Sequence, residues 1–316
     1  MTRTLVTGAL GFIGSAYVRA HKDDDIFLLA RPSGQRFLCR LEVVGGRPGS
    51  AQFCWLDLAR DDLADAVGEV DTIVHFAAKT FVDRSIADPT PFIESNVVGS
   101  FKLLEAIRRS RTVEHVWWQS TDEVYGAILE GAYREDARLN PSNPYAATKA
   151  AADGLALSYF NTYGIKVIIG RAENAYGPWQ GREKAIPTFV RCALQAKPIP
   201  VYGDGQHRRQ WVHVVDVVEC VDHLLEHGKP GEVYHVAGHQ ELSNLELAQG
   251  VLGALGLPAE RIQFIEDRDI RPGHDRRYAL STQKVRETGW QPRIKLQDGL
   301  PNVVEWYAAH KEWTFG

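Results

Sequence analysis

The 316-residue sequence has few cysteines, no excess of basic residues and no long apolar run. Its four cysteines, at positions 39, 54, 192 and 220, lie far apart and form no C-x-x-C pair. This indicates free thiols in a reducing compartment and makes a zinc site unexpected. Lys and Arg number 36 against 40 Asp and Glu, so no basic surplus points to nucleic acid. We therefore expect a cytoplasmic protein with no metal and no nucleic-acid partner.

No apolar run approaches the roughly 18 residues of a membrane helix, so no membrane association is expected. Arg3 before the stretch Leu5 to Ala16 resembles a short signal peptide, but the glycines in that stretch have a better explanation below. A chain of 316 residues can form one large buried core, or two lobes that share an interface. A two-lobed enzyme is the natural match to this size.

The first motif is a strand, a glycine turn and a helix. The apolar run Thr4 to Val6 leads into Thr7-Gly8-Ala9-Leu10-Gly11-Phe12-Ile13-Gly14, and a helical pattern follows. Gly8 permits the tight turn, Gly11 lets backbone N–H groups approach a pyrophosphate, and Gly14 allows the helix to pack closely on the strand. The motif predicts a dinucleotide site that includes Phe12 and Ile13, and an empty structural turn is the alternative.

The second expected strand, Ile26 to Ala30, lacks the acid that binds the adenosine ribose in many NAD sites. Ala30 and Arg31 stand there instead. Arg31, with Arg36, could contact a 2′-phosphate, or Arg31 could be a solvated loop residue. We expect NAD as cofactor and keep NADP open.

Strands and helices then alternate, which predicts an α/β fold of the Rossmann type, a doubly wound parallel sheet. Strands are expected at Gln52 to Trp55 and Thr72 to Phe76, with a short helix around Leu63 between them and a long helix at Phe92 to Arg109. Asp57 and Leu58 follow the first of these strands. Ala77 and Ala78 follow the second, where small side chains leave room for a flat ring or simply pack closely.

Two adjacent acids, Asp122 and Glu123, come at the end of another expected strand, residues 114 to 120. Because ligands bind at the carboxyl ends of parallel strands, the pair indicates proton chemistry, provided that the strand has already turned into a loop. Tyr145 and Lys149 lie four residues apart on the next helix, which runs to about Tyr163, and therefore share one face. A nearby ammonium and a cationic nicotinamide are both expected to lower the pKa of the phenol.

After the expected strand Lys166 to Gly170, the sequence contains loops rich in aromatic and arginine residues. The arginines present donors that suit a diphosphate. A helix at Val214 to His227 and a strand at Val233 to Val236 are expected to return to the first sheet. We therefore predict a dinucleotide-binding domain at 1–171 with a returning segment at about 212–236. Residues 172–316 would form mainly a smaller C-terminal α/β substrate lobe.

Together these motifs resemble the extended short-chain dehydrogenase/reductase superfamily, and within it the nucleotide-sugar 4,6-dehydratases, most closely those of dTDP-glucose. The likeness spans nearly the whole chain. The glycine turn and the Tyr145/Lys149 pair mark the superfamily, whereas Thr121-Asp122-Glu123-Val124-Tyr125-Gly126 is specific to the dehydratases. The segments 82–86, 201–206 and 271–278 also resemble that family.

The resemblance implies a reaction in three steps on a nucleotide-linked glucose. Tyr145, supported by Lys149, would take the 4-hydroxyl proton while hydride leaves C4 for the nicotinamide. Glu123 would then remove the C5 proton while Asp122 protonates the departing 6-hydroxyl, and Thr121 would donate a hydrogen bond to the C4 oxygen. Hydride would return to C6 and give the 4-keto-6-deoxy sugar. The alternative is a 4-epimerase or decarboxylase of a nucleotide sugar, which does not need the two acids.

The same resemblance implies further contacts and a homodimer formed through helices such as 92–109 and 143–163. The expected cofactor contacts, beside the glycine turn and Arg31, are Asp57, Leu58, Ala77, Ala78, Lys79, Asn96, Ser120, Tyr145 and Lys149. The expected sugar-nucleotide contacts are Arg84, Asn174, Lys184, Tyr202, Arg209, Arg271 and His274. The chain departs from the usual pattern at Lys79 and Phe81 (usually Glu and His), at Glu173 and Ala175 (usually Ser and Asn), and at His235 (usually Asn).

Overall fold

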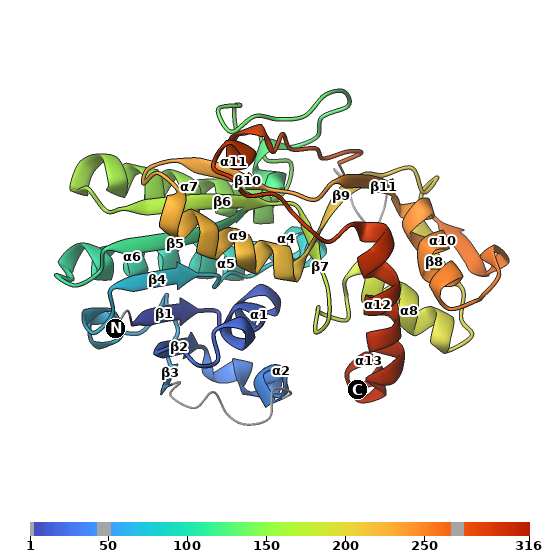
Figure 1. Ribbon diagram of the computed structural model, residues 1–316, viewed down its shortest axis with the longest axis horizontal. Helices are drawn as coiled ribbons and strands as arrows, with labels where there is room; N and C mark the ends of the chain where they lie inside the picture. The colour runs from blue at the N-terminus through green and yellow to red at the C-terminus, as the bar shows by residue number, and fades with distance from the viewer. Residues whose placement is uncertain (1–2, 43–51, 267–274) are drawn as a thin grey trace.

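The computed structural model describes residues 3–42, 52–266 and 275–316, so Arg271 and His274 lie outside the described residues. Its main feature is a seven-stranded sheet in the order β10-β6-β5-β4-β1-β2-β3, in which all neighbouring strands are parallel (Figure 1). The strands are β1 (Thr4–Thr7), β2 (Ile26–Ala30), β3 (Gln52–Trp55), β4 (Thr72–His75), β5 (His115–Thr121), β6 (Val167–Ala172) and β10 (Val233–Val236).

The strand order reverses between β1 and β4, which is the point where the chain leaves the first half of the sheet and begins the second. In a doubly wound sheet the carboxyl ends of the two strands at such a reversal diverge, and a crevice for a ligand opens between their loops. The predicted doubly wound parallel sheet is therefore confirmed.

Helices cover both faces of the sheet. One face packs against α1 (Phe12–Ala20), α9 (Val214–His227) and α11 (Gln283–Glu287), through buried residues such as Tyr17, Val217 and Val285. The other packs against α3 (Ala64–Gly68), α6 (Gly99–Arg109) and α7 (Pro144–Tyr163), through residues such as Leu103 and Ala156. Shorter elements are η1 (Pro32–Phe37), α2 (Cys39–Glu42), α4 (Val82–Ala87), α5 (Thr90–Phe92) and η3 (Asp122–Tyr125).

A smaller α/β lobe has a third core of its own, seen at the right of Figure 1. Its strands form one sheet in the order β11-β9-β7 and a two-stranded sheet of β12 and β8. They are β7 (Asn174–Tyr176), β8 (Ile199–Tyr202), β9 (Arg208–His213), β11 (Gln240–Ser243) and β12 (Ile262–Ile265). Its helices are α8 (Ala185–Leu194), α10 (Asn244–Ala254), η4 (Ala259–Arg261), α12 (Leu296–Ala309) and α13 (Lys311–Phe315).

The chain passes from the large sheet to the smaller lobe and back. After β9 it forms α9 and then β10, which pairs with β6 at the edge of the large sheet. The helix at Val214–His227 and the strand at Val233–Val236 are confirmed at their predicted bounds. The division into domains at residue 171 stays a prediction.

The long helix expected at Phe92 to Arg109 is interrupted in its first part. Ile93–Val98 forms wide π-helical turns, η2, before the regular helix α6 begins at Gly99. Such turns occur often at functional sites. Here they contain Asn96, whose buried side chain accepts a hydrogen bond from Lys79 N at 2.7 Å and donates to Lys79 O at 2.9 Å. Hydrophobic periodicity does not report this change of helix type.

Within the described ranges, no helix is both long and apolar enough to cross a membrane. In the same ranges, no group of three or more His, Cys, Asp or Glu side chains could hold a metal ion. The four cysteines are free, as expected, and Cys220 is buried.

Gly170, in the middle of β6, offers a test of how tightly the sheet is packed. A Cβ atom at this position would overlap the indole of Trp117, which is fully buried on β5. We expect Gly170→Ala to lower the free energy of unfolding by roughly 1–3 kcal/mol, because a filled core cannot take an added methyl group without moving its neighbours. Urea denaturation monitored by circular dichroism measures the change.

Gly253 in α10 is the matched control, because a Cβ added there meets no atom within 4 Å. Gly253→Ala should raise the free energy of unfolding by up to about 1 kcal/mol through the loss of glycine's backbone freedom. If Gly170→Ala were as stable as Gly253→Ala, the described packing of Trp117 would be wrong.

Candidate active site

The glycine turn after β1 is packed too closely against neighbouring backbone to accept side chains. Gly8 has a left-handed backbone (φ +68°), and a Cβ there would come within 2.7 Å of Ala77 N. A Cβ on Gly14 would overlap Gly8 O, which explains the need for glycine where α1 packs on the turn. Helix α1 starts after Gly11 with no side-chain cap and no acid in its first turn. Its free N–H groups and positive helix end suit a phosphate.

Four parallel strands bring the other expected cofactor residues to the same edge of the sheet. Arg31 follows β2, Asp57 and Leu58 follow β3, Ala77 follows β4, and Ser120 lies near the end of β5. Ala77 N donates to Thr7 Oγ1 at 3.3 Å, so the end of β4 is tied directly to the end of β1. The buried Arg40 donates to Leu10 O at 2.6 Å and so stabilises the glycine turn. Sequence patterns gave no signal for Arg40.

The two acids lie where β5 ends. The strand stops at Thr121, and a single 3-10 turn, η3, begins at Asp122 and ends before Gly126 (φ +75°). The strand has therefore become a turn at the acids, as the hypothesis required. Thr121 Oγ1 donates to Asp122 Oδ1 at 2.9 Å and accepts from Glu123 N at 3.4 Å. Within the described residues, Asp122 Oδ2 is buried without a hydrogen-bond partner.

Tyr145 and Lys149 reach the same place from α7, and both are buried. Lys149 Nζ donates to Gln119 O in β5 at 2.7 Å, which holds the helix against the strand end. The hydroxyl of Thr121 contacts the phenol of Tyr145 and favours its ionised form. The structure thus brings together all five predicted catalytic residues: Thr121, Asp122, Glu123, Tyr145 and Lys149.

Asn143 is a site residue that sequence reasoning missed. Its side-chain oxygen caps α7 by accepting from Ala146 N at 2.9 Å, and its amide donates to Glu123 Oε2 at 3.2 Å. The helix start and one acid are therefore fixed by the same side chain. An Asn before a Pro at the start of a helical pattern is a capping signal, and it could have found this residue.

The environment pushes the two acids toward partial protonation. Burial, reinforced by the charge of Glu123, raises the pKa of Asp122 to about 7. Desolvation also raises the pKa of Glu123, but the positive charge of Lys184, the amide of Asn143 and the charge of Arg209 oppose it. Near neutral pH, Asp122 can therefore serve as an acid and Glu123 as a base, which is the division of roles that two neighbouring carboxyls need.

The expected lowering of the Tyr145 pKa is not found in the chain by itself. Burial, and after it the negative charge of Glu123, raise that pKa. Burial also lowers the pKa of Lys149, against the pull of Asp153. In the chain without cofactor, desolvation and the two acids determine this raised pKa. The lowering of the pKa by the ammonium together with a cationic nicotinamide stays a prediction.

Two of the predicted sugar-nucleotide residues lie close enough to the acids for their charges to act on Glu123. The charges of Lys184, just before α8, and Arg209, in β9, both act on Glu123. Arg209 stacks on the ring of Tyr278, with 4.3 Å between its guanidinium carbon and the ring centroid. Arg84 and Lys184 lie over the ring of Phe81, at 5.2 and 5.6 Å from its centroid. Asn174 begins β7, and Tyr202 ends β8 in the smaller lobe.

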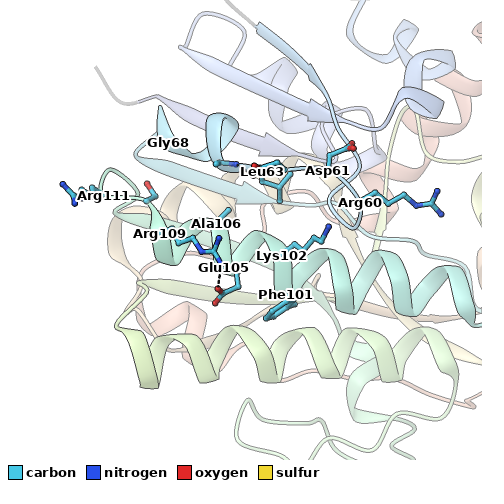
Figure 2. A pocket seen from close by; sticks show the side chains of 13 residues that line it. Arg60, Asp61, Leu63, Gly68, Phe101, Lys102, Glu105, Ala106, Arg109 and Arg111 are labelled. Carbon is cyan, nitrogen blue, oxygen red and sulfur yellow. Dashed lines mark hydrogen bonds and ion pairs between the residues drawn. The ribbon is translucent and has the colours of Figure 1, made fainter.

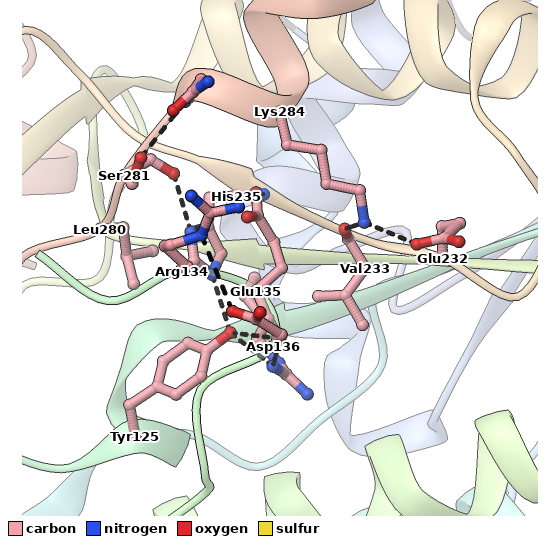
Figure 3. Close-up of polar contacts among 12 residues, drawn as sticks. Tyr125, Arg134, Glu135, Asp136, Glu232, Val233, His235, Leu280, Ser281 and Lys284 are labelled. Atoms are coloured by element: carbon pink, nitrogen blue, oxygen red, sulfur yellow. Dashed lines mark hydrogen bonds and ion pairs between the residues drawn. The ribbon is translucent and has the colours of Figure 1, made fainter.

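A buried polar network supports the turn that contains the acids (Figure 3). Tyr125, in η3, bonds through its hydroxyl to His235 Nε2 at 2.8 Å and accepts from Arg171 at 2.5 Å. His235 Nδ1 lies 2.9 Å from Ser281 O, and burial lowers the pKa of this histidine to about 3. Arg171 also pairs with the buried Asp153 of α7 at 2.9 Å. A neutral His235 thus joins η3 to β10.

The comparisons with known proteins agree with this geometry. The family model described as GDP-mannose 4,6 dehydratase matches residues 5–303. The chain is 43% identical over 323 residues to the dTDP-glucose 4,6-dehydratase of Streptomyces niveus, covering 98% of this chain and 94% of the relative. It is 41% identical over 322 residues to the enzyme of the same name from an Actinoplanes species, covering 98% of this chain and 99% of that relative.

Solved structures show the same similarity. DesIV, a dTDP-glucose 4,6-dehydratase from Streptomyces venezuelae solved with NAD and TYD bound, superposes with a TM-score of 0.92 at 41% identity, covering 99% of this chain and 98% of that one. A UDP-glucuronic acid 4-epimerase from Bacillus cereus, in complex with UDP-glucuronic acid and NAD, gives a TM-score of 0.90 at 25% identity and covers 98% and 99%. The chain therefore belongs to the GDP-mannose 4,6-dehydratase family, as one of the nucleotide-sugar 4,6-dehydratases similar to the dTDP-glucose enzymes.

Proposed function

We propose that this chain is an NAD-dependent dTDP-glucose 4,6-dehydratase, which converts dTDP-glucose to the dTDP-4-keto-6-deoxy sugar and water. The observation that supports this most strongly is the pair of adjacent acids at the end of β5, the buried Asp122 and the half-buried Glu123, beside Tyr145. An epimerase on the same fold has no use for two such acids. The relatives named above, and the NAD in their solved structures, support both the substrate and the cofactor.

The residues at the sheet edge fit NAD. Gly8, Gly11 and Gly14 let the turn and α1 pack closely, because a Cβ at each would crowd the backbone of Ala77 or Gly8. The uncapped start of α1 suits the pyrophosphate. NAD supplies the hydride acceptor for C4 and later the hydride donor for C6. The other residues we propose to line this site are Phe12, Ile13, Arg31, Asp57, Leu58, Ala77, Ala78, Lys79, Asn96 and Ser120.

In the first step Tyr145 would accept the proton of the 4-hydroxyl. The phenol needs stabilisation as an anion, because burial and Glu123 both oppose its ionisation. The hydroxyl of Thr121 favours the phenolate. The positive charge of Lys149 would act in the same direction. With substrate bound, Thr121 would turn its single hydroxyl hydrogen from Asp122 to the C4 oxygen.

In the second step Glu123 would remove the proton at C5, and Asp122 would give its proton to the 6-hydroxyl, which leaves as water. One carboxyl gains a proton and the other loses one, so the pair keeps its total charge. This agrees with a pKa of about 7 for Asp122. In the last step Glu123 would return its proton to C5. Each such transfer is worth roughly 10²- to 10⁴-fold in rate.

The nucleotide sugar would be bound by positive and polar groups of the smaller lobe and its edge. Lys184 and Arg209 are the best supported, because their charges already act on Glu123. Arginine and lysine near a diphosphate supply charge-assisted hydrogen bonds. The remaining proposed contacts are Arg84, Asn174, Tyr202, Arg271 and His274.

We also propose a cytoplasmic homodimer. Its free cysteines suit a reducing compartment. Large apolar side chains are exposed along η2, α6 and α7: Ile93 is 49% exposed, Phe101 46% and Tyr163 53%. An open hollow of about 690 Å³ between residues 60–64 and α6 includes Phe101 (Figure 2). A second copy of the chain that docks on α6 and α7 would cover these groups, as apolar dimer interfaces do.

Replacing Glu123 by Gln tests the elimination. Glu123→Gln should slow formation of the dehydrated sugar by roughly 10²- to 10⁴-fold, because the amide cannot take the C5 proton. Absorbance of the reduced cofactor should still appear in a single turnover. Mass spectrometry of dTDP-glucose reactions, in which the product lacks one water, measures the loss. Glu130→Gln, which removes an exposed carboxyl, is the control that should keep full turnover.

The pH dependence tests the role of Asp122. An acid must be protonated to act, and the pKa of Asp122 is raised to about 7, so kcat/KM should fall as pH rises through that value. In the Asp122→Asn variant the residual activity should be low and should lack this alkaline limb. A wild-type profile that stays flat to pH 9 would argue against Asp122 as the acid.

Sedimentation velocity tests the dimer. Phe101→Glu places a charge on the exposed face of α6 and should convert dimer to monomer at micromolar concentration. Phe264→Glu, at a 54% exposed residue of β12 in the smaller lobe, should leave the dimer intact. Wild-type protein that sediments only as monomer would overturn this part of the proposal.

A further inference from the structure

Glu173 is a buried carboxyl that the reaction above does not use. It lies one residue beyond β6 and is 5% exposed. Its Oε1 accepts from Leu280 N at 3.0 Å, whereas its Oε2 is buried with no hydrogen-bond partner in the part of the chain that the structure describes. A buried polar atom without a hydrogen-bond partner costs free energy, so the burial of Glu173 Oε2 needs an explanation.

The sheet register places Glu173 beside Asp122. Thr121 at the end of β5 pairs with Ala172 at the end of β6, and Asp122 and Glu173 are the next residues on the two strands. Neighbouring parallel strands lie about 4.8 Å apart. Asp122 is 4% exposed; its Oδ1 accepts from Thr121, and its Oδ2 has no hydrogen-bond partner among the described residues. Two buried carboxyls, each with one bonded and one open oxygen, therefore stand at adjacent strand ends.

The groups around Asp122 and Glu173 favour a state in which one of the two carboxyls keeps its proton. Burial raises the pKa of Glu173 well above its usual range, and the charges of Asp122 and Glu241 add to this. Arg277 opposes it, but Nε and Nη2 of Arg277 donate to Glu241 at 2.9 and 2.8 Å.

The charge of Glu123 raises the pKa of Asp122, and the charge of Arg209 lowers it. The charges of Asp122 and Glu123 both act on Tyr145 of α7. His235, which follows on β10, contributes no charge because burial lowers its pKa to about 3. Two buried carboxyls at neighbouring strand ends cannot both ionise near neutral pH without a large cost in free energy.

We propose that Asp122 and Glu173 form a buried carboxyl pair that shares one proton, and that Glu173 is the positioning residue that keeps Asp122 supplied with it. When Asp122 gives the shared proton to the 6-hydroxyl, the O–H bond at Asp122 Oδ2 breaks, a new O–H bond forms on the departing oxygen, and water leaves. The pair then takes up one proton from solvent, which balances the proton that Tyr145 took from the 4-hydroxyl and releases to solvent. No electron changes hands, and the sum of protons is unchanged over the cycle.

This inference rests on the proposed dehydratase function, because it concerns the acid of that reaction. Its consequence is that the pair loses its shared proton at higher pH than Asp122 would alone. The alkaline limb of the pH profile should therefore lie higher in the wild type than in any variant that lacks the second carboxyl.

The test compares pH profiles of kcat for the wild type and Glu173→Gln, which keeps the shape and the acceptor for Leu280 N. We expect the alkaline limb to move to lower pH by about one unit, so that turnover near pH 8 falls about tenfold while turnover near pH 6 changes little. Glu135→Gln, at a half-buried glutamate that also has a raised pKa, should leave the limb in place. An unchanged limb in Glu173→Gln, or an equal loss of turnover at every pH, overturns the proposal.

A second readout does not depend on turnover. With ¹³C-labelled glutamate, the infrared spectrum at neutral pH should contain a protonated carboxyl band that is absent from Glu173→Gln and shifted in Asp122→Asn. A band that Asp122→Asn does not move would mean that Glu173 is protonated for packing alone, and the pairing would be wrong. If the wild type forms no dehydrated sugar from dTDP-glucose, the proposed function fails instead, whatever this band shows.

Discussion

The desolvation of carboxyl groups at the end of β5 is the constraint on which the rest of the site depends. An exposed Asp122 would be ionised at neutral pH and could give no proton to a leaving hydroxyl. Burial in the sheet edge, with Glu123 beside it, raises its pKa to about 7. Burying an acid costs free energy, and this cost must be offset by contacts that hold the surrounding side chains in place.

Those contacts come from elements far apart in the sequence. Thr121 bonds Asp122, Asn143 bonds Glu123 while capping α7, and Lys149 fastens that helix to β5. Behind them, Tyr125, Arg171 and His235 hold the turn against β6 and β10. The parallel sheet matters because it brings the carboxyl end of every strand to one edge, so the glycine turn at Gly8 and the acids after β5 lie at the same edge.

Much of this arrangement could be predicted from the sequence, where a local pattern determined it. The glycine turn, the strand Ile26–Ala30, the helix Val214–His227 and the Tyr145/Lys149 spacing each depend on neighbours within a few residues, and the described elements agree. The family was also recognised from the Thr121 to Gly126 motif, and the comparisons confirm it.

What the sequence did not predict depends on distant contacts. The π-helical turns at Ile93–Val98 are stabilised by Asn96 reaching Lys79. The role of Asn143 needs the position of Glu123, twenty residues earlier. The raised pKa of Tyr145 comes from burial that no spacing rule reports. Glu173 was visible only as a departure from a family pattern until the β5–β6 register placed it next to Asp122.

The central claim is that one site oxidises C4, removes water across C5 and C6 and reduces C6 on the same sugar. The most direct measurement uses dTDP-glucose deuterated at C4, with mass spectrometry and NMR of the product. The account predicts a product that has lost one water and carries the deuterium in its new 6-methyl group. Deuterium found at C4 of a product of unchanged mass, with an inverted 4-hydroxyl, would contradict the account and identify an epimerase.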